Sequence, residues 1–158
     1  MQKITPCLWF DTEGEEAAEF YTSVFPNSRI VEVTRYGSAG PRAEGSVMTV
    51  NFELDGQQFI ALNGGPDFKF NEAISLEVHC ESQDEVDSFW SALTADGGEE
   101  GPCGWLKDKY GVSWQIVPNV LYELIQDPDQ EKSQRVMAAM LQMRKIEIDE
   151  LEKAAAGA

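Results

Sequence analysis

Hydrophobic positions change their spacing along residues 3–25, and the change marks a strand followed by a helix. The extended apolar run at residues 3–10 predicts the strand. Apolar residues then recur at helical spacing and form one stripe, which we expect to pack on a sheet. The positions of this stripe are Ala17, Phe20, Tyr21, Val24 and Phe25. Residues 12–15 (TEGE) form a T-x-x-E capping box, so we expect the helix to begin there.

Three further extended runs complete this unit, at residues 29–36, 46–54 and 57–63. Asp55-Gly56, between the last two runs, is a strong signal for a two-residue hairpin. In the run at 46–54 an apolar set alternates with a mixed set, so we expect the apolar set to meet the helix and the mixed set to face the other side of the sheet. The apolar set is Met48, Val50, Phe52 and Leu54, and the mixed set is Val47, Thr49, Asn51 and Glu53.

The same order of elements starts again in the second half of the chain. A strand at residues 74–80 precedes a second capping box at residues 82–85 (SQDE). The helix after it has its apolar positions at Val86, Phe89, Trp90 and Leu93, and short strands follow at 99–101, 104–107 and 112–117. The two copies are offset by about seventy residues. This repeat predicts a single α+β domain built from a duplicated βαβββ module, with residues 1–66 and 72–118 as the two copies.

Residues 119–158 form a C-terminal helical extension of a different kind. Asp127-Pro128 has the pattern of a helix start with proline in the first position, and Asp149-x-x-Glu152 is a last capping pattern. An apolar edge lies between them, at Val136, Met137, Met140 and Leu141. Because the extension carries more apolar surface than one small helix can hide, it packs either on its own domain or on a second chain.

The charge of the chain limits its partners. Acidic residues outnumber basic ones, 28 against 12, and the formal net charge is -16. This charge repels nucleic acid phosphates and anionic membrane surfaces, so we expect neither as a partner. It either attracts a cationic ligand or simply gives a solvated surface that favours solubility. The chain has no apolar run of membrane-spanning length and no pattern of paired cysteines, which predicts a cytoplasmic protein.

Four motifs carry a resemblance to a known family. They are residues 6–11 (PCLWFD), 16–25 (EAAEFYTSVF), 61–66 (ALNGGP) and 103–118 (CGWLKDKYGVSWQIVP). With the repeated module, they resemble the PhnB-like family of the glyoxalase/bleomycin resistance superfamily, also called the vicinal oxygen chelate superfamily. The resemblance implies that the two modules form a curved mixed sheet around a central pocket, and that the protein is a homodimer. Members often carry the name demethylubiquinone methyltransferase, but nothing here resembles the Gly-rich turn of Rossmann-type methyltransferases, so we expect no cofactor.

The metal positions implied by the resemblance lack suitable side chains. Enzymes of this superfamily commonly hold one divalent ion with His or Glu from the first strand of each module and from a closing strand. The matching positions are Ile4, Ala73 and Gln115. Ile4 and Ala73 have no lone pair to donate, and the neutral amide of Gln115 is a weak ligand for zinc, iron or manganese. We therefore expect no metal site.

Strand alternation from the same positions predicts which side chains line the pocket. In module one these are Pro6, Leu8, Phe59, Ala61 and Asn63, whereas Trp9 is expected on the helix side. The candidates for ligand binding are Asn63, Trp105, Lys107, Ser113 and Gln115. Aromatic and aliphatic walls with few polar groups suit a small, partly apolar organic molecule that carries an anionic or carbonyl group.

Two residues are candidate catalytic bases. Burial in the pocket would raise the pKa of Glu77 and suit it to general base catalysis, and Lys107 could pair with Glu77 or orient an anion. His79, the single histidine of the chain, is the second candidate. For both Glu77 and His79, a merely structural role or a place on the surface is the alternative.

Three functions are consistent with these observations. The first is a metal-independent protein that binds a small molecule. The second is a metal-independent enzyme, an isomerase, lyase or group-transfer catalyst, with Glu77 or His79 as the base. The third is a structural or regulatory role in which the pocket is vestigial.

Overall fold

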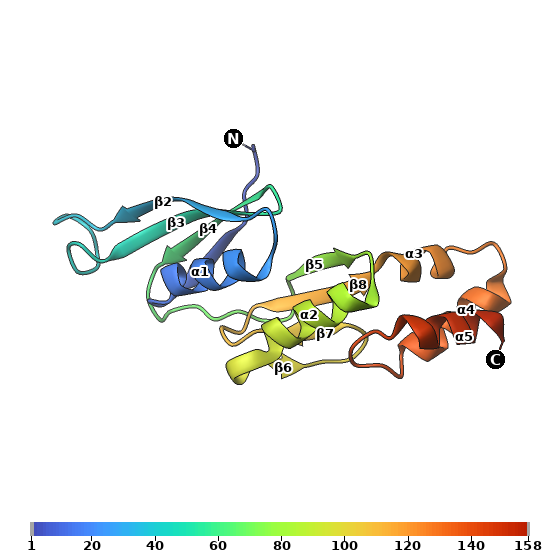
Figure 1. Cartoon of the computed structure of the whole chain (residues 1–158). Coiled ribbons are helices and arrows are strands. Elements are labelled where there is room, and N and C mark those ends of the chain that lie inside the picture. Colours follow the sequence, from blue (N-terminus) through green and yellow to red (C-terminus); the bar gives the residue numbers. More distant parts are fainter. Residues whose placement is uncertain (1, 158) are drawn as a thin grey trace. The chain divides into compact units, whose positions relative to one another are not determined.

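The computed structural model describes residues 2–157 and contains two compact units, Met1–Phe70 and Asn71–Ala158 (Figure 1). Each unit contains one four-stranded sheet, and the order of strands is the same in both. The first strand of each unit lies beside the fourth, and the third and second follow. This shared order confirms the α+β class and the duplicated βαβββ module. That both modules belong to one domain stays a prediction.

The first unit packs helix α1 (Gly14–Val24) on one face of its sheet. The strands are β1 (Cys7–Phe10), β2 (Arg29–Arg35), β3 (Val47–Leu54) and β4 (Gln57–Asn63), with β1 parallel to β4 and the other pairs antiparallel. Tyr21 of α1 is fully buried and stacks on Phe52 of β3, with ring centroids 6.3 Å apart. The apolar set of β3 therefore faces the helix, as predicted. Asp55 and Gly56 have φ angles of 47° and 80°, which confirms the hairpin turn.

The start of α1 differs from the predicted capping box. The cap residue is Glu13, whose side chain makes no capping hydrogen bond to the helix. Instead, the amide of Gly14 donates a hydrogen bond to Oδ1 of Asn63, at 2.7 Å. A Cβ atom at Gly14 would lie only 2.7 Å from that same oxygen, so glycine allows the close approach. The first turn is thus satisfied by a residue from the end of β4, and the capping-box prediction for residues 12–15 is wrong.

The second unit repeats this plan with helix α2 (Gln83–Thr94) and a short 3-10 helix, η1 (Ala95–Gly97). Its strands are β5 (Ser75–Cys80), β6 (Glu99–Glu100), β7 (Trp105–Lys107) and β8 (Ser113–Pro118), with β5 parallel to β8. Here the predicted cap at Ser82 is confirmed, because the Ser82 side chain accepts a hydrogen bond from the amide of Glu85. The Glu85 carboxylate accepts from the amide of Glu81, at 2.8 Å, and so reaches one residue before the Ser82 amide that a complete capping box would use.

A buried carboxylate organises the turn between β7 and β8. Asp108 is only 3% exposed. Its Oδ1 accepts hydrogen bonds from the amides of Tyr110 and Val112, at 2.9 and 3.0 Å, and its Oδ2 accepts from the indole N–H of Trp114, at 2.9 Å. Gly111, with a φ angle of 88°, supplies the left-handed residue of the turn. These bonds explain why the aspartate, the glycine and the second tryptophan occur together in the motif at residues 103–118.

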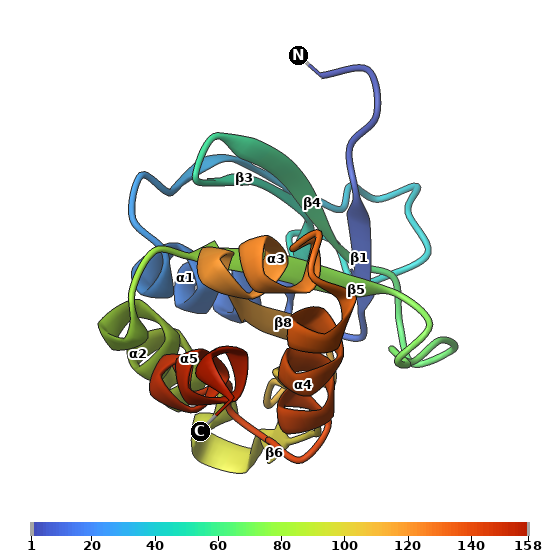
Figure 2. The ribbon, with the colours of Figure 1, turned by 90° about the vertical axis from the view of Figure 1, so that its right-hand side faces the viewer.

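The C-terminal extension contains α3 (Asn119–Ile125), α4 (Gln130–Met140) and α5 (Ile148–Ala156), and α4 packs against α5 (Figure 2). Its core lies within the second unit and consists of Val117, Leu121, Val136, Ile146 and Leu151. The amides of Cys103 and Gly104 donate to the carbonyls of Met143 and Arg144, at 2.8 and 2.7 Å. Of the two arrangements left open above, the structure shows the extension packed on its own unit.

The helix starts in the extension differ from both patterns predicted for it. Helix α4 begins two residues after Pro128, and Asp129 caps it by accepting from the amides of Glu131 and Lys132. Helix α5 begins at Ile148, whose amide donates to Oε1 of Gln83 at 2.7 Å. None of the helices within residues 2–157 has the length and apolarity needed to cross a lipid bilayer.

Candidate functional site

Six of the seven predicted site residues lie on one face of the second sheet. In-register partners on neighbouring strands point to the same side. The pairs Ser75–Ser113, Glu77–Gln115, Trp105–Gln115 and Lys107–Ser113 are in register. The alternate positions, including Leu106, Trp114 and Ile116, are buried, as expected for the side covered by α2. We call the opposite side the polar face; it consists of Ser75, Glu77, His79, Trp105, Lys107, Ser113 and Gln115.

Hydrogen bonding on the polar face is incomplete. The side-chain amide of Gln115 donates to Oγ of Ser75, at 2.9 Å. The Ser113 side chain is only 1% exposed, and its hydroxyl has no hydrogen-bond partner in the structure. A buried hydroxyl without a partner costs about 1–3 kcal/mol, so buried polar groups are usually satisfied. Ser113 is therefore a position at which a bound molecule could gain a hydrogen bond.

Lys107 forms an ion pair with Glu72, and not with Glu77 as considered above. The hydrogen bond from Lys107 lowers the pKa of the Glu72 carboxyl, and the same bond raises the pKa of the Lys107 ammonium. Both partners are partly accessible to water, so an anionic ligand can compete with Glu72 for the ammonium. Sequence reasoning missed Glu72 because this residue lies before the strand, where the alternation of side chains between the two faces of a sheet does not apply.

The two candidate bases are exposed. The prediction that Glu77 acts as a general base depended on burial of its carboxyl in a pocket. Glu77 is exposed in the structure, so the predicted burial is wrong. The His79 ring stacks on Tyr122 of α3, with centroids 5.6 Å apart and the planes inclined by 29°. Tyr122 therefore adds an aromatic group to the polar face. Sequence reasoning missed it because α3 lies outside the repeated module, and only the fold brings it to β5. The catalytic roles of Glu77 and His79 stay predictions.

The predicted orientation of β1 and β4 in the first unit is wrong. Phe59 stacks on Phe52 at 5.4 Å, and Ala61 is in register with Val50, so both face α1 and not a pocket on the opposite side. Leu8 pairs with Ala61 and shares that side, whereas Trp9 lies on the other. The cause is the run Leu8-Trp9-Phe10, in which three consecutive apolar residues give no alternation to read.

Asn63, the seventh predicted site residue, also lies on the α1 side, and it has two internal partners. Its Oδ1 accepts from the Gly14 amide, and its Nδ2 donates to the Val47 carbonyl at 3.2 Å. These bonds join β4 to the start of the helix and to β3. A role in ligand binding stays a prediction, but the structural role of Asn63 follows from these contacts.

Replacing Asn63 with alanine should lower the free energy of unfolding by about 1–2 kcal/mol, because the Gly14 amide loses its acceptor. Asn63→Asp should lose less, since a carboxylate oxygen can still accept from Gly14. Urea titration followed by tryptophan fluorescence measures both. Asn119→Ala, at an exposed position, is the control. An Asn63→Ala midpoint equal to that of the control would contradict this role.

The positions matched to metal ligands do not fit a divalent ion. Ile4 is 87% exposed and precedes β1, and Ala73 precedes β5. Gln115 is held by Ser75 and presents only a neutral amide. Within residues 2–157, no group of three or more His, Cys, Asp or Glu side chains is arranged to hold a metal ion. The donor set at these positions is therefore unsuited to the superfamily's usual ion.

The family model and the solved structure of one relative carry the same family name. The model of the 3-demethylubiquinone-9 3-methyltransferase family matches residues 2–117. The PhnB protein from Bacillus cereus, which carries the same methyltransferase name, is 40% identical; the match covers 74% of this chain and 99% of that protein, with a TM-score of 0.66. No curated protein matches the chain.

More distant solved structures share the fold. A Pseudomonas aeruginosa protein is 18% identical over 75% of this chain and 98% of its own, with a TM-score of 0.61. The fosfomycin resistance protein FosX from Listeria monocytogenes is 14% identical over 78% of this chain and 97% of its own, with a TM-score of 0.53. Neither strand-to-helix turn of the present chain, at residues 11–13 or 81–82, is rich in glycine as a nucleotide-type cofactor turn would be.

Proposed function

Because the chain belongs to the PhnB-like 3-demethylubiquinone-9 3-methyltransferase family of the vicinal oxygen chelate superfamily, we propose that it binds a small organic molecule without a divalent metal. The ligand site in this proposal is the polar face of the second sheet. A homodimer in the cytoplasm, as the sequence and the family resemblance imply, belongs to the same proposal. The free state of Cys7, Cys80 and Cys103 supports a reducing compartment.

The buried hydroxyl of Ser113 is the observation that carries the proposal. It lies in register with Lys107 on one side and with Ser75 on the other, so a donor, a cation and a second hydroxyl share one region. Trp105 adds an apolar wall next to them. A carboxylate or carbonyl oxygen would satisfy Ser113 and attract Lys107, while the rest of the molecule covers the indole. A small, partly apolar acid or ketone is therefore the best match.

A thermal-shift screen of carboxylic acids and carbonyl compounds, run with and without chelator, tests this proposal. We expect a hit that raises the melting temperature equally in both conditions. For that hit, Ser113→Ala and Lys107→Met should each weaken binding about ten-fold, because each substitution removes one hydrogen bond in which one partner is charged. Titration calorimetry measures the dissociation constants. Ser91→Ala, on an exposed position of α2, should bind normally. The proposal would be refuted by a hit that binds only when metal is added, or by a hit whose affinity is unchanged in both Ser113→Ala and Lys107→Met.

A metal-independent enzyme is the alternative, and the contact of His79 with Tyr122 is what favours it. The stacked ring holds the imidazole on the same face as Glu77. In this case a chelated, purified sample would convert the bound compound. Glu77→Gln or His79→Ala would then abolish turnover while leaving binding intact. Turnover that survives both substitutions would remove both residues as bases.

A further inference from the structure

The polar face of the second sheet ends at the C-terminal extension. Helix α3 begins directly after β8, and Figure 1 shows it continuing past the ends of β5 and β8. Val117 of β8 is in register with His79, so both point to this side of the sheet. Val117 is only 5% exposed, because it belongs to the core of the extension, against which Tyr122 also packs. A molecule on the polar face therefore meets the extension at this end.

Two aromatic rings lie at this closed end. The His79 ring stacks on Tyr122, with the centroids 5.6 Å apart and the planes inclined by 29°. Within residues 2–157, the imidazole makes no hydrogen bond and no ion pair, so the stack on Tyr122 is what orients it. His79 is exposed and Tyr122 is half-buried, so a ligand can reach this pair of rings. Aromatic groups pack on other rings in offset or edge-to-face arrangements, and such packing favours an aromatic ligand.

The opposite end of the face carries the cation and the hydroxyl that the proposed function assigns to an acid. Lys107 and Ser113 are in register there, and Ser113 begins β8. A strand rises about 3.3 Å per residue, which separates residues 113 and 117 by about 13 Å. Gln115 lies midway, with Trp105 beside it on β7. An anion site, an apolar wall and an aromatic end therefore follow one another along β8.

The middle of the face favours an uncharged spacer. Glu77 is in register with Gln115, on the other side of β8 from Trp105. Its side chain is exposed, so the carboxylate can stay in water while an apolar spacer covers the indole. A second negative charge on the ligand would meet Glu77 and a chain whose net charge is -16. A single acidic group, at one end of the molecule, is the best match.

We infer that the ligand of the polar face is an acid that carries an aromatic ring at its far end, and that Tyr122 selects this ring and limits the length of the molecule. The inference rests on the function proposed above and narrows its ligand class. A ketone would not displace Glu72 from Lys107, since it carries no charge. An aliphatic acid would leave the His79–Tyr122 pair without an aromatic partner. A molecule longer than the face would meet the core of the extension.

Titration calorimetry of the full chain with phenyl-terminated acids of increasing length, from phenylacetate to 8-phenyloctanoate, tests the inference. Cyclohexyl acids of the same lengths are the matched probes, since they keep the carboxylate and the size of the ring. We expect affinity to rise to one best length and then fall. At that length the phenyl acid should bind about three- to ten-fold more tightly than its cyclohexyl counterpart. A surface that is merely apolar would give no preference for the phenyl ring.

NMR gives a local readout of the same complex. His79 is the single histidine of the chain, so its imidazole signals can be followed without ambiguity. We expect these signals to shift when the phenyl acid of the best length binds, because its ring lies next to the imidazole. Butyrate, which reaches only the Lys107 end, should bind more weakly and leave them unchanged.

Substitutions of Tyr122 assign the selection to its ring. Tyr122→Leu keeps an apolar side chain against the core, and it should remove the preference for the phenyl acid. Tyr122→Phe should retain the preference, and Tyr122→Ala should move the best length to a longer acid. Phe68→Leu is the matched control, because it makes the same kind of change at a 64% exposed ring in the first unit.

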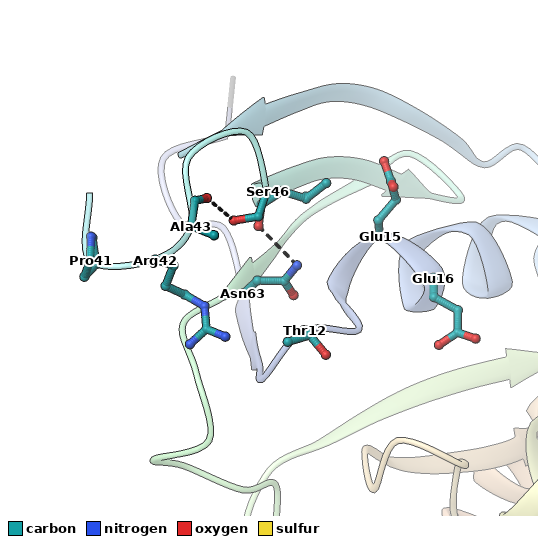
Figure 3. Close-up of a pocket in the computed structure, with 9 residues that line it drawn as sticks. Thr12, Glu15, Glu16, Pro41, Arg42, Ala43, Ser46 and Asn63 are labelled. Atoms are coloured by element: carbon teal, nitrogen blue, oxygen red, sulfur yellow. Dashed lines mark hydrogen bonds between the residues drawn. The ribbon is translucent and has the colours of Figure 1, made fainter. Parts of the chain in front are cut away.

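A pocket in the first unit is another place where an acid could bind. Figure 3 shows this pocket, of about 580 Å³, with Arg42 in its lining. Arg42→Gln removes one positive charge there, as Lys107→Met does on the polar face, and it should leave binding unchanged. Binding that is weakened by Arg42→Gln and not by Lys107→Met would overturn both the inference and the proposed function, and so would the failure of every acid to bind.

Other outcomes overturn the inference alone. In these, acids bind and Lys107→Met weakens them, so the proposed function stands. The phenyl acids then show no advantage over the cyclohexyl acids, or the His79 signals stay in place. Retention of the advantage in Tyr122→Leu, or its loss in Tyr122→Phe, would equally show that the ring of Tyr122 does not select the ligand.

Discussion

Replacing Asp108 with alanine is expected to lower the free energy of unfolding by about 3 kcal/mol, because three donors lose their acceptor at once. The carboxylate is buried and accepts from Tyr110, Val112 and Trp114. A hydrogen bond to a charged group contributes about 1.5–3 kcal/mol, and some donors regain water when the turn opens. The loss should therefore exceed that of any single hydrogen bond considered above.

Asp108→Asn separates the two sides of the carboxylate. The amide oxygen can still accept from the turn amides, but the Nδ2 group would face the indole N–H of Trp114, and two donors repel. We expect a smaller destabilisation than for alanine, together with a change in the near-UV signal of the buried tryptophan. Urea unfolding measures the free energies, with exposed Asp67→Ala as the control. An Asp108→Ala variant as stable as this control would show that the turn holds without its carboxylate.

Strong periodicity allowed much of the fold to be predicted. The alternation in Val47–Leu54 identifies the face of β3 that meets α1, and the cap at Ser82 begins α2 as expected. The repeat identifies the second copy of the module, and the shared strand order confirms it. These features are local, since each depends on residues close together in the chain.

Three of the incorrect predictions share a different physical origin, because each depends on a contact between residues distant in sequence; the start of α4 is an exception, since Asp129 caps that helix locally. Asn63 satisfies Gly14 across the unit, so the local box at residues 12–15 is not needed. Gln83 begins α5 in the same way, from another element. Uniformly apolar β1 has no alternation, so its partner β4 decides which side each residue takes.

The candidate site shows the same division. Strand alternation in β7 and β8 places Trp105, Lys107, Ser113 and Gln115 on one face, as predicted from module two. The partners that complete this face come from outside the pattern: Glu72 lies before β5, and Tyr122 lies in α3. The family model ends at residue 117, so the contact of Tyr122 with His79 belongs to a part of the chain that the family match does not include. The extension therefore adds to the polar face a group that the family match does not include.

Replacing Ile146 with alanine is expected to be the most damaging change in that extension. Ile146 is fully buried in the core that joins the extension to the second unit. A Cβ atom at Gly104 would lie 3.1 Å from its Cγ1, so the side chain packs closely on the backbone before β7. Its carbonyl also accepts from Nε2 of Gln83, at 3.0 Å. Removing the buried side chain should cost about 2–5 kcal/mol, the range for isoleucine to alanine in a core.

Ile4→Ala is the matched control, since Ile4 is 87% exposed and the same atoms are removed. We expect that control to change the free energy of unfolding by less than about 0.5 kcal/mol. Hydrogen exchange gives the local readout: the amides of Cys103 and Gly104, which donate to the extension, should exchange faster in Ile146→Ala, while those of β3 stay protected. Because Tyr122 packs against the same core, His79 should also lose its ring contact, visible as a shift of the single histidine signal in the NMR spectrum. Unchanged exchange at Gly104 and an unchanged histidine signal would show that the extension holds its place without Ile146.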